Sequence, residues 1–518
     1  MPNRVVAVLL TLAAVLAPGF VVDSAHAAAS KPVLAVHPAT VVQQDPITLS
    51  GRTTQRRVIV YRRLYGHAWT RIGTARTTHG HFTYRTRPVA GRTNLYRTSA
   101  AGKARTSRVA KARSVGCTPL LAHGDVATWT QDTTVINTLT RNWAQLICSA
   151  APNSTITMAE MYAYENSATV ARLMNALRAV HAYRGVRVRV LVQRGGYYPG
   201  AQWAALKRHF RFAEVHYCTY GCHSSDPNAH AHTKFMVLSK TIFGGSAVLE
   251  SSANWSGEQF DRQRQSGVYV YGNNRLTQAY LQEWASLTTR SLLDATTWRS
   301  AGSGISYSFD PRPAATDPIA SELHTLTCEP GDSIGVADTL LSRPTLVAEL
   351  TRLAQAGCQV QVLIDPSGSV VTALSASTRA VVEHDKFVVI DAHAAGTGAA
   401  RQEVIHGSEN YSTGSMTLSD QQLLLLRRPD VYATYLWWFG YLWKRSVALP
   451  PTPTAPPPTT TPPTTPPPTT TPPTTAPPPE PDSVRTTAGA SRLVGASTCS
   501  QPAASADDDS TSGTCAQG

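Results

Sequence analysis

The chain has 518 residues, enough for two or three domains of roughly 100 to 200 residues each. It is 42% apolar, 15% charged and contains 35 prolines, whereas an average chain is about 25% charged and about 5% proline. The apolar content is therefore sufficient for a sizeable core. The low charge and the many prolines exclude a chain that is globular over its whole length.

The net charge of +14 comes from one segment of the chain. Residues 30–116 carry 17 Lys and Arg against one acid, Asp45, which is +16. After residue 116, 29 basic residues face 31 acidic ones, which gives −2. The overall charge therefore does not by itself indicate a nucleic-acid-binding protein, because the basic character is confined to this N-terminal region.

Residues 1–27 have the pattern of a secretory signal peptide. Arg4 supplies the positive charge, residues 5–16 are almost wholly apolar, and Ala25, His26 and Ala27 form a small-residue cleavage site. The apolar run is shorter than the roughly 20 residues that cross a bilayer. We therefore expect a secreted, extracellular protein, with association with the cell wall as a further option.

Export places the eight cysteines in an oxidising compartment, where disulfides form. Their order suggests local pairs, although the sequence does not fix the connectivity. The suggested pairs are Cys117 with Cys148, Cys218 with Cys222, Cys328 with Cys358, and Cys499 with Cys515.

Residues 30–113 alternate apolar and polar side chains, as in Val58, Val60 and Arg62, between regularly spaced glycines. This pattern predicts a small antiparallel β-sandwich with one solvated face, and it resembles the immunoglobulin-like accessory modules of secreted actinobacterial proteins. The segment holds no polar constellation suited to catalysis. Its arginines indicate either attachment to anionic wall polymer, lipid or nucleic acid, or only a solvated surface encoded by a GC-rich genome.

From residue 117 the pattern changes to strand, amphipathic helix, strand, and it occurs twice. The first copy has strands at 155–158 and 186–192, and the second has strands at 333–336 and 358–364. We therefore predict two α/β lobes of similar plan, residues 117–300 and 301–446, related by a pseudo-two-fold axis.

Each lobe carries the same three polar side chains: a His and a Lys two residues apart, then an Asn 20 or 24 residues after the Lys. These are His232, Lys234 and Asn254 in the first lobe and His384, Lys386 and Asn410 in the second. On a strand, residues i and i+2 face the same side, so each His and Lys should point into the same space. A single pair is typical of a structural histidine, whereas two matching sets in a duplicated chain indicate a catalytic site.

With these sets the chain resembles the phospholipase D superfamily, whose signature is HxKxxxxD followed by GSxN, over residues 117–445. The second copy is complete, with Asp391 and Ser408, whereas the first has Ser239 for Asp and Ser251 for Gly. The resemblance implies two phospholipase D-type α/β/α lobes and chemistry without a metal or other cofactor. Because the family's Asp mainly supports the motif strand, we expect the first lobe to remain competent.

The residue types suit cleavage of a phosphodiester. Lysines neutralise the phosphate oxygens, and asparagines donate hydrogen bonds as charge moves in the transition state. One neutral imidazole attacks phosphorus while a protonated one supplies the leaving alkoxide with a proton. The resemblance makes His232 the nucleophile and His384 the acid, an order that the residues alone leave open.

A catalytic imidazole usually has its second nitrogen held by a carboxylate or an amide. At ten and eleven residues after the motif asparagines stand Asp420 and Gln421 in one lobe and Arg264 and Gln265 in the other. We single out Asp420 as the candidate orienting carboxylate, with a turn residue as the alternative, and Gln265 as its counterpart where the family commonly has an acid.

A zinc site is the competing chemistry in the first lobe, because two thiols and two imidazoles can bind zinc tetrahedrally. A disulfide is the simpler fate of two cysteines in a secreted chain. The cluster within 17 residues consists of His216, Cys218, Cys222, His223, His230 and His232.

The remaining segments carry little chemistry. Residues 432–443 are rich in Trp and Tyr, which predicts either an interfacial lipid anchor or the last helix of the second lobe packed on its core. Residues 447–482 form a Pro/Thr-rich spacer, and residues 483–518 a polar tail. We expect disorder in both.

We therefore expect a monomeric, secreted phosphodiesterase that hydrolyses or transfers the head group of glycerophospholipids at a membrane surface. The near-neutral charge after residue 116 favours lipid over the alternative of a secreted nuclease, whose groove would be basic. A binding protein with a decayed site is the third interpretation, suggested by Ser239 and Ser251.

Overall fold

The computed structural model describes residues 33–448, except 43–44, 90, 101–105, 121–124, 133–137, 165, 197, 199, 293–297, 367–373, 375–376 and 382. The described residues belong to one compact unit. The predicted signal peptide, polar tail and Cys499–Cys515 pair lie outside the described residues, as does the predicted spacer except Val447 and Ala448, which form a short strand. None of the helices in the described ranges is long and apolar enough to cross a membrane.

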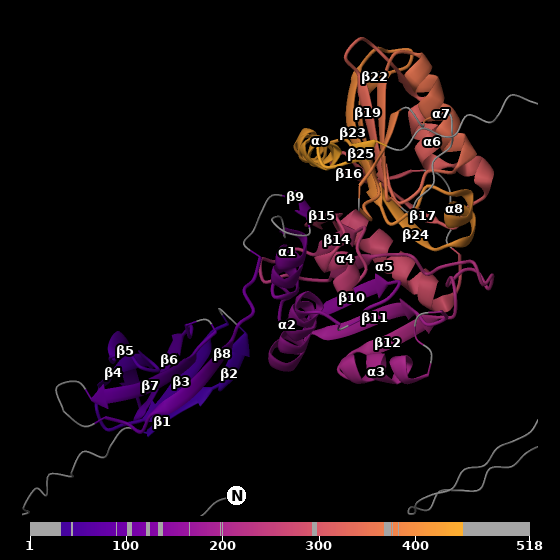
Figure 1. Ribbon diagram of the computed structural model, residues 1–518. Helices are drawn as coiled ribbons and strands as arrows, with labels where there is room; N and C mark the ends of the chain where they lie inside the picture. The colour runs from indigo at the N-terminus through magenta and orange to yellow at the C-terminus, as the bar shows by residue number, and fades with distance from the viewer. Residues whose placement is uncertain are drawn as a thin grey trace, which may run out of the picture. The chain divides into compact units, whose positions relative to one another are not determined.

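The N-terminal module is all β (Figure 1). Its strands pair in the order β1-β3-β6-β5-β4-β7-β8-β2, antiparallel except for the parallel pair of β2 and β8. Ile47 and Leu49 pack with Val60, Tyr96 and Ala112 from the far end of this order, so the folded sheet closes over a small core. The strands are β1 (Val33–His37), β2 (Thr40–Val42), β3 (Ile47–Arg52), β4 (Arg57–Leu64), β5 (Thr70–Thr78), β6 (His81–Thr86), β7 (Thr93–Ala100) and β8 (Ala110–Val115).

The first lobe is a seven-stranded sheet in the order β12-β11-β10-β13-β14-β15-β9. Its strands are β9 (Val126–Gln131), β10 (Thr155–Glu160), β11 (Arg187–Gln193), β12 (Glu214–Cys218), β13 (Phe235–Leu238), β14 (Ala247–Ser251) and β15 (Gln265–Tyr271). Its helices are α1 (Thr138–Ile147), α2 (Ala168–Arg184), α3 (Ala201–His209), α4 (Gly257–Asp261) and α5 (Asn274–Thr289).

The second lobe is a ten-stranded sheet in the order β16-β17-β24-β23-β22-β19-β20-β21-β25, with β18 paired to β22. Its strands are β16 (Arg299–Gly302), β17 (Ile305–Asp310), β18 (Leu326–Thr327), β19 (Ser333–Asp338), β20 (Gln359–Ile364), β21 (Thr378–Ala380), β22 (Phe387–Ala394), β23 (Ala400–Gly407), β24 (Gln421–Leu426) and β25 (Val447–Ala448). Its helices are η1 (Ala314–Thr316), α6 (Pro318–His324), α7 (Pro344–Gln355), α8 (Thr413–Leu418) and α9 (Pro429–Trp443).

The two sheets repeat one topology. The order β12-β11-β10-β13-β14-β15-β9 corresponds strand for strand to β21-β20-β19-β22-β23-β24-β17, with the first three strands of each parallel and the rest antiparallel. Both predicted strand–helix–strand units are present, as β10-α2-β11 and β19-α7-β20. The duplication predicted from the sequence is therefore a duplication of the sheet.

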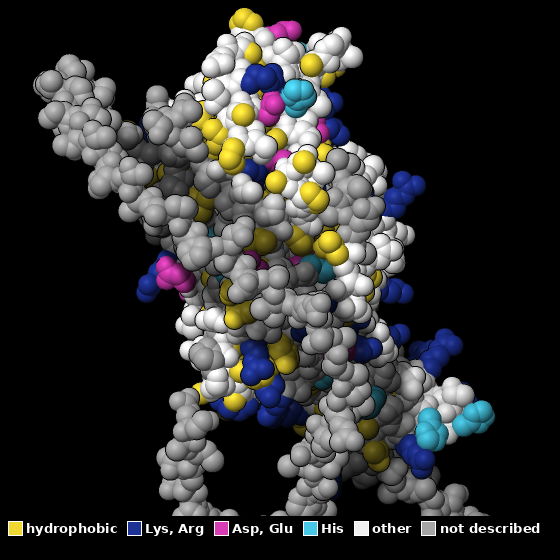
Figure 2. Space-filling view, turned by 90° about the vertical axis from the view of Figure 1, so that its right-hand side faces the viewer, with side chains coloured by type: hydrophobic (Ala, Val, Ile, Leu, Met, Phe, Trp, Pro, Cys, Tyr) yellow, Lys and Arg dark blue, Asp and Glu magenta, His cyan; other side chains and the backbone are white. Residues whose placement is uncertain are grey.

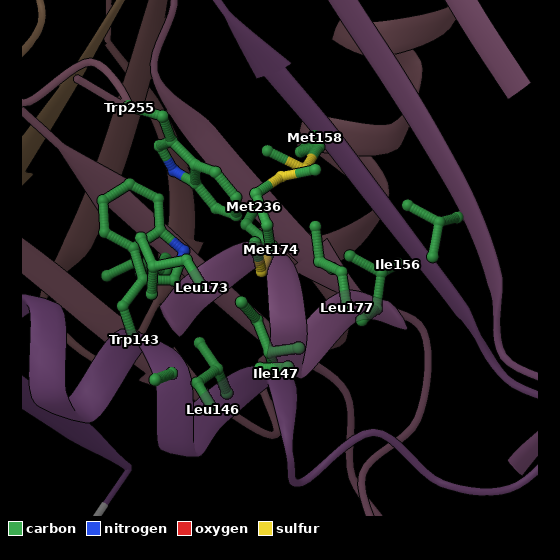
Figure 3. Packing of buried hydrophobic residues seen from close by; sticks show 14 of the residues in the cluster. Trp143, Leu146, Ile147, Ile156, Met158, Leu173, Met174, Leu177, Met236 and Trp255 are labelled. Carbon is green, nitrogen blue, oxygen red and sulfur yellow. The ribbon is translucent and has the colours of Figure 1, made fainter. Parts of the chain in front are cut away.

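Three apolar layers make up the cores of the two lobes. One packs α1 and α2 on the first sheet, where Trp143 and Trp255 meet edge to face with ring centroids 5.5 Å apart (Figure 3). Another packs α7 on the second sheet. The middle layer contains residues of both sheets, such as Val268 and Leu424, together with α5 and α9. Because this layer is shared, the lobes form one hydrophobic body.

Helix α9 lies on the core, as one of the two interpretations of the aromatic run predicts. Tyr435, Trp438 and Leu442 are fully buried, and only Leu436 and Trp437 are exposed large apolar residues of this helix. The helix contacts β9 of the first lobe as well as β22 and β23 of the second. It therefore fastens one lobe to the other.

The Ser that replaces Gly in the first motif is accommodated by its cross-strand partner. Ser251 on β14 faces Gly267 on β15, whereas Gly407 on β23 faces Leu423 on β24. A Cβ atom on Gly407 would lie 2.1 Å from the carbonyl oxygen of Gln422. In each lobe one member of this cross-strand pair is glycine, on β23 in the second lobe and on β15 in the first. Ser251 is therefore compatible with an intact active site.

This pairing predicts that Gly267 is intolerant of a side chain. A Cβ there would lie 2.8 Å from a methyl group of Leu139 and 2.9 Å from the carbonyl oxygen of Glu250. We expect Gly267→Ala to lower the free energy of unfolding by about 1–3 kcal/mol through overpacking. Gly440→Ala is the control, because the added Cβ would meet no described atom within 4 Å apart from the backbone of its own helix, and it should be neutral or stabilising by about 0.5–1 kcal/mol. Urea denaturation measures both, and equal stability of the two variants would contradict the explanation.

Candidate active site

Both motif histidines and both motif asparagines line one cavity of about 460 Å³. His232 and Lys234 stand in the extended segment directly before β13, and His384 and Lys386 directly before β22. The sequence analysis predicted these pairs to lie on the strands themselves, whereas in the structure they lie directly before the first residues of β13 and β22. The lining residues are Met161, Tyr162, Asn228, His230, His232, Asn254, Gln259, His384, Asn410, Ser412, Gly414, Ser415, Ser419 and Gln421.

Each motif lysine folds back onto its own histidine. Nζ of Lys234 donates to the carbonyl oxygen of His232 at 2.7 Å, and Nζ of Lys386 donates to that of His384 at 2.7 Å. Both lysines are fully buried. The spacing of two residues thus brings the lysine ammonium group next to the histidine in each lobe.

A buried acid ends the first strand of each strand–helix–strand unit, near the lysine, a feature that the sequence analysis missed. Glu160 is the last residue of β10 and Asp338 the last of β19, at equivalent positions. Burial raises the pKa of Glu160 well above its usual value and that of Asp338 to about 7, and the nearby lysines act against this rise. A signal was present in the sequence, because a carboxylate stands two residues after each of the predicted strands 155–158 and 333–336.

Each histidine is fixed by a backbone hydrogen bond from the opposite lobe. The N–H of His232 donates to the carbonyl oxygen of Asp420 at 2.9 Å, and the N–H of His384 donates to that of Arg264 at 3.0 Å. Asp420 and Arg264 are the equivalent residues ten positions after the two asparagines. The lobes therefore hold each other's histidines in a reciprocal pair of bonds.

Gln421 is the side chain that contacts the ring of His232. Its Oε1 lies 2.8 Å from Nδ1 of His232 and also accepts the hydroxyl of Ser408 at 2.8 Å, while its Nε2 donates to Oγ of Ser415 at 2.7 Å. The amide orientation is thereby assigned by its partners, so Oε1 accepts from a protonated Nδ1. This tautomer leaves the lone pair of Nε2 of His232 for chemistry.

The carboxylate of Asp420, our candidate for this role, points elsewhere. It accepts from the N–H of Cys222 and His223 and pairs with Nδ1 of His223 at 2.7 Å. Gln421, one position later, orients the ring of His232 instead. The sequence could have indicated this role for Gln421, because glutamine stands at the equivalent position of both lobes, as Gln265 and Gln421.

His384 has a different environment. Its Nδ1 lies 3.2 Å from Nζ of Lys386, and its Nε2 lies 3.4 Å from the amide nitrogen of Gln259. Gln265, the counterpart of Gln421, accepts the hydroxyl of Ser252 at 2.7 Å. The pseudo-symmetry of the backbone therefore does not extend to the partners of the two rings.

Both imidazoles resist protonation. Burial lowers the pKa of His232 well below its usual value, and the positive charges of Lys234 and Lys386 lower it further, whereas the hydrogen bond that His232 donates to Gln421 acts in the opposite direction. Burial, Lys386 and Lys234 lower the pKa of His384 in the same direction. Arrival of an anion would oppose the effect of the lysines and raise both pKa values.

The two asparagines have hydrogen-bonding capacity to offer. Both side-chain polar atoms of Asn254 are buried without a partner in the described part of the chain, and so is Oδ1 of Asn410. Buried amides of this kind are normally satisfied. Because both asparagines line the cavity, their free atoms suit a bound ligand.

The remaining predicted supporting residues take structural positions. Ser239, which replaces the motif Asp, accepts the N–H of Thr155 at the start of β10 at 2.9 Å. Asp391 accepts the hydroxyl of Tyr432 on α9 at 2.8 Å. Ser239 therefore still ties the motif strand β13 to β10.

Three disulfides are present, Cys117–Cys148, Cys218–Cys222 and Cys328–Cys358, and they are consistent with an extracellular protein. The zinc alternative does not assemble. Cys218 and Cys222 are oxidised, His216 pairs with Glu214, and His223 pairs with Asp420. Within the described ranges, no three His, Cys, Asp or Glu residues are grouped to hold a metal ion.

Comparison with known proteins points to one family. Residues 144–288 match the family described as the phospholipase D-like domain of cardiolipin synthase. No curated protein matches the chain in sequence. Solved structures with a similar arrangement include polyphosphate kinase from Porphyromonas gingivalis, at 11% identity and a TM-score of 0.45 over 75% of this chain and 72% of that one.

Phosphatidylserine synthase from Haemophilus influenzae Rd KW20 aligns at 11% identity and a TM-score of 0.44 over 64% of this chain and 89% of that one. Yeast tyrosyl-DNA phosphodiesterase aligns at 10% identity and a TM-score of 0.36 over 62% of this chain and 92% of that one. The family match therefore identifies a phospholipase D-like domain at residues 144–288, the segment that carries His232, Lys234 and Asn254.

Proposed function

We propose that the protein is a secreted phosphodiesterase that cleaves the head group from glycerophospholipids through a phosphohistidine on His232. The observation that carries the proposal is the convergence of His232, Asn254, His384 and Asn410 on one cavity, with a buried lysine next to each histidine. This is the set of groups that a two-step displacement at phosphorus needs.

In the first step, Nε2 of His232 attacks phosphorus and the bond from phosphorus to the leaving alcohol oxygen breaks. His384 gives its proton to that oxygen, so the alcohol leaves neutral. Lys234 and Lys386 balance the phosphate charge. In the second step a water molecule, or another alcohol, gives its proton to His384 and attacks phosphorus, which releases the phosphoryl group and restores His232.

The charge around the cavity favours a phospholipid over a nucleic acid. Among the described residues that line it there is no Lys or Arg, and most of them are neutral and polar. On the face drawn in Figure 2, outside the grey parts, Lys and Arg side chains stand in separate small groups and form no continuous stripe. A nuclease would be expected to follow the phosphate backbone with such a stripe.

The two-histidine mechanism predicts that neither imidazole can be replaced. We expect His232→Ala and His384→Ala each to lower kcat on a soluble phosphodiester by at least about 10³-fold, because nucleophile and acid act in the same step. His324→Ala, whose side chain is 75% exposed on α6, is the control and should retain full activity. Near wild-type turnover by either cavity variant, with an unchanged circular dichroism spectrum, would exclude the mechanism.

The pKa shifts predict an acidic optimum. Because burial and the two lysines lower the pKa of both histidines, the singly protonated pair exists in the free enzyme only below the usual histidine pKa of about 6.5. We expect kcat/KM to fall as the pH rises through that region. Gln421→Glu, which keeps an acceptor at Nδ1 of His232 and adds a negative charge, should raise the pKa of this nucleophile, so the loss of kcat/KM on the acidic side should begin about one pH unit higher or more. A profile unmoved by the substitution would contradict the assigned contact.

Substrate class is tested by parallel assays on phosphatidylcholine vesicles and plasmid DNA. We expect head-group release from the vesicles and no cleavage of the DNA; the reverse result would establish the nuclease alternative.

For the basic module we propose attachment to anionic surfaces without a part in catalysis. Replacing the exposed Arg56, Arg57 and Arg76 by Glu should weaken binding to anionic vesicles, most strongly at low salt, where surface charges are least screened. Turnover of a soluble substrate should not change. A loss of soluble-substrate turnover in the folded variant would overturn this division.

A further inference from the structure

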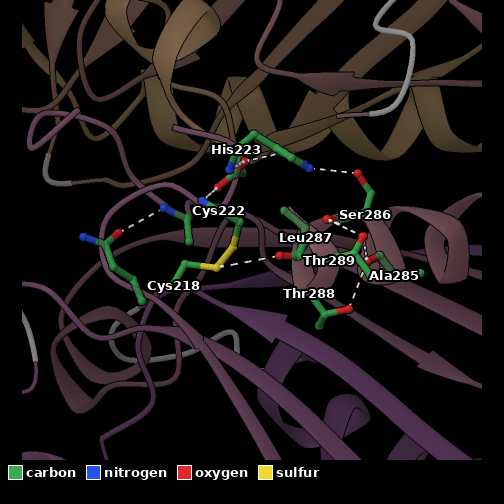
Figure 4. Close-up of a disulfide and its surroundings, with 11 residues drawn as sticks. Cys218, Cys222, His223, Ala285, Ser286, Leu287, Thr288 and Thr289 are labelled. Atoms are coloured by element: carbon green, nitrogen blue, oxygen red, sulfur yellow. Dashed lines mark hydrogen bonds and ion pairs between the residues drawn. A yellow bond between two sulfur atoms is a disulfide. The ribbon is translucent and has the colours of Figure 1, made fainter. Parts of the chain in front are cut away.

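A small disulfide loop of the first lobe lies against the second lobe beside the active site. Cys218 ends β12, and its disulfide to Cys222 closes a loop of four residue steps. His223 follows the loop and reaches Oγ of Ser286 on α5, 2.8 Å from its Nε2 (Figure 4). Cys218, Cys222 and the side chain of His223 are all buried.

The loop presents three donors to one buried carboxylate of the opposite lobe. The N–H groups of Cys222 and His223 and Nδ1 of His223 all point to Asp420, which is fully buried. A buried carboxylate needs such partners, since an unpaired buried charge is costly. The position of Asp420 is therefore set by the loop.

Asp420 in turn fixes the backbone on both sides of the catalytic segment. Its N–H donates to the carbonyl oxygen of His230 at 2.8 Å, and its carbonyl oxygen accepts the N–H of His232 at 2.9 Å. Its chain neighbour is Gln421, the side chain that accepts from Nδ1 of His232. The chain of contacts thus runs from the disulfide through Asp420 to the ring of His232.

We propose that the Cys218–Cys222 disulfide and His223 are positioning groups for the nucleophile: they hold Asp420, and through Gln421 they set the tautomer and orientation of His232. This inference rests on the proposed function for its kinetic consequence. The physical claim, that the loop determines the state of the His232 ring, is independent of the substrate.

The kinetic test replaces the disulfide in the full-length protein. We expect Cys218→Ser/Cys222→Ser to lower kcat on a soluble phosphodiester by about 10- to 100-fold with little change in KM, because a displacement of about 1 Å in a reacting group has an effect of this order. His223→Ala, which keeps the disulfide and removes one donor, should lower kcat in the same way. The control is Cys328→Ser/Cys358→Ser, whose disulfide lies at the start of β20, away from the cavity lining.

Coupling identifies the route. If the loop acts through Gln421, adding His223→Ala to Gln421→Ala should cause no further loss of kcat, since coupled residues are not additive. Full additivity, or a loss of kcat in the control disulfide variant as large as in the Cys218/Cys222 variant, would overturn the proposal.

A readout without substrate separates this inference from the proposed function. Nitrogen-15 NMR of the imidazole should show His232 protonated on Nδ1 in the wild type and a mixture of tautomers in His223→Ala. If the wild type cleaves no phosphodiester, the proposed function fails and the NMR result alone decides the inference. If the wild type is active and both variants retain its kcat and its Nδ1 tautomer, the inference is wrong and the proposed function stands.

Discussion

The reciprocal backbone bonds between the lobes are the constraint on which the site depends. Each histidine donates its N–H to a carbonyl of the opposite lobe, so neither imidazole is held by its own lobe alone. The shared apolar layer and α9 keep the sheets in the relation that these bonds require. A rigid frame matters because the attacking and protonating groups must act on one phosphorus with little tolerance in distance.

Duplication gives the frame its symmetry, and individual side chains break it. The clearest case is the contact of Glu250 with His406, where Oε1 and Nδ1 are 3.3 Å apart in the fully buried junction of the lobes. These residues precede Ser251 and Gly407, so they occupy the same position in the two copies. Two identical side chains could not form an acid–imidazole pair there. Once both copies are in one chain, the residues can differ and complement each other.

The same divergence separates the two histidines. An acceptor, Oε1 of Gln421, faces the ring of His232, whereas donors from Lys386 and Gln259 lie near the nitrogens of His384. A ring with protonated Nδ1 keeps a free lone pair on Nε2, which suits a nucleophile. Lys234 and Lys386 lie buried next to the two histidines, and an incoming phosphate would balance their charge. Binding of the phosphate should therefore raise the pKa of His384 and favour its protonated form, because the bound anion opposes the charge of the lysines.

The sequence by itself determined the parts that follow from local pattern. Alternation and helix spacing gave the strand–helix–strand units, and the repeated His, Lys and Asn sets gave the candidate residues, because these signals lie within short stretches of chain. The tertiary structure decided what depends on contacts across the lobes. It assigned the orientation of His232 to Gln421 and not to Asp420, brought Glu160 and Asp338 near the lysines, and placed the Cys218–Cys222 loop on Asp420. Those partners lie up to about two hundred residues apart in the chain. Asp420 and Gln421 are neighbours in the sequence, so only their contacts with the opposite lobe show which of the two side chains reaches the ring of His232.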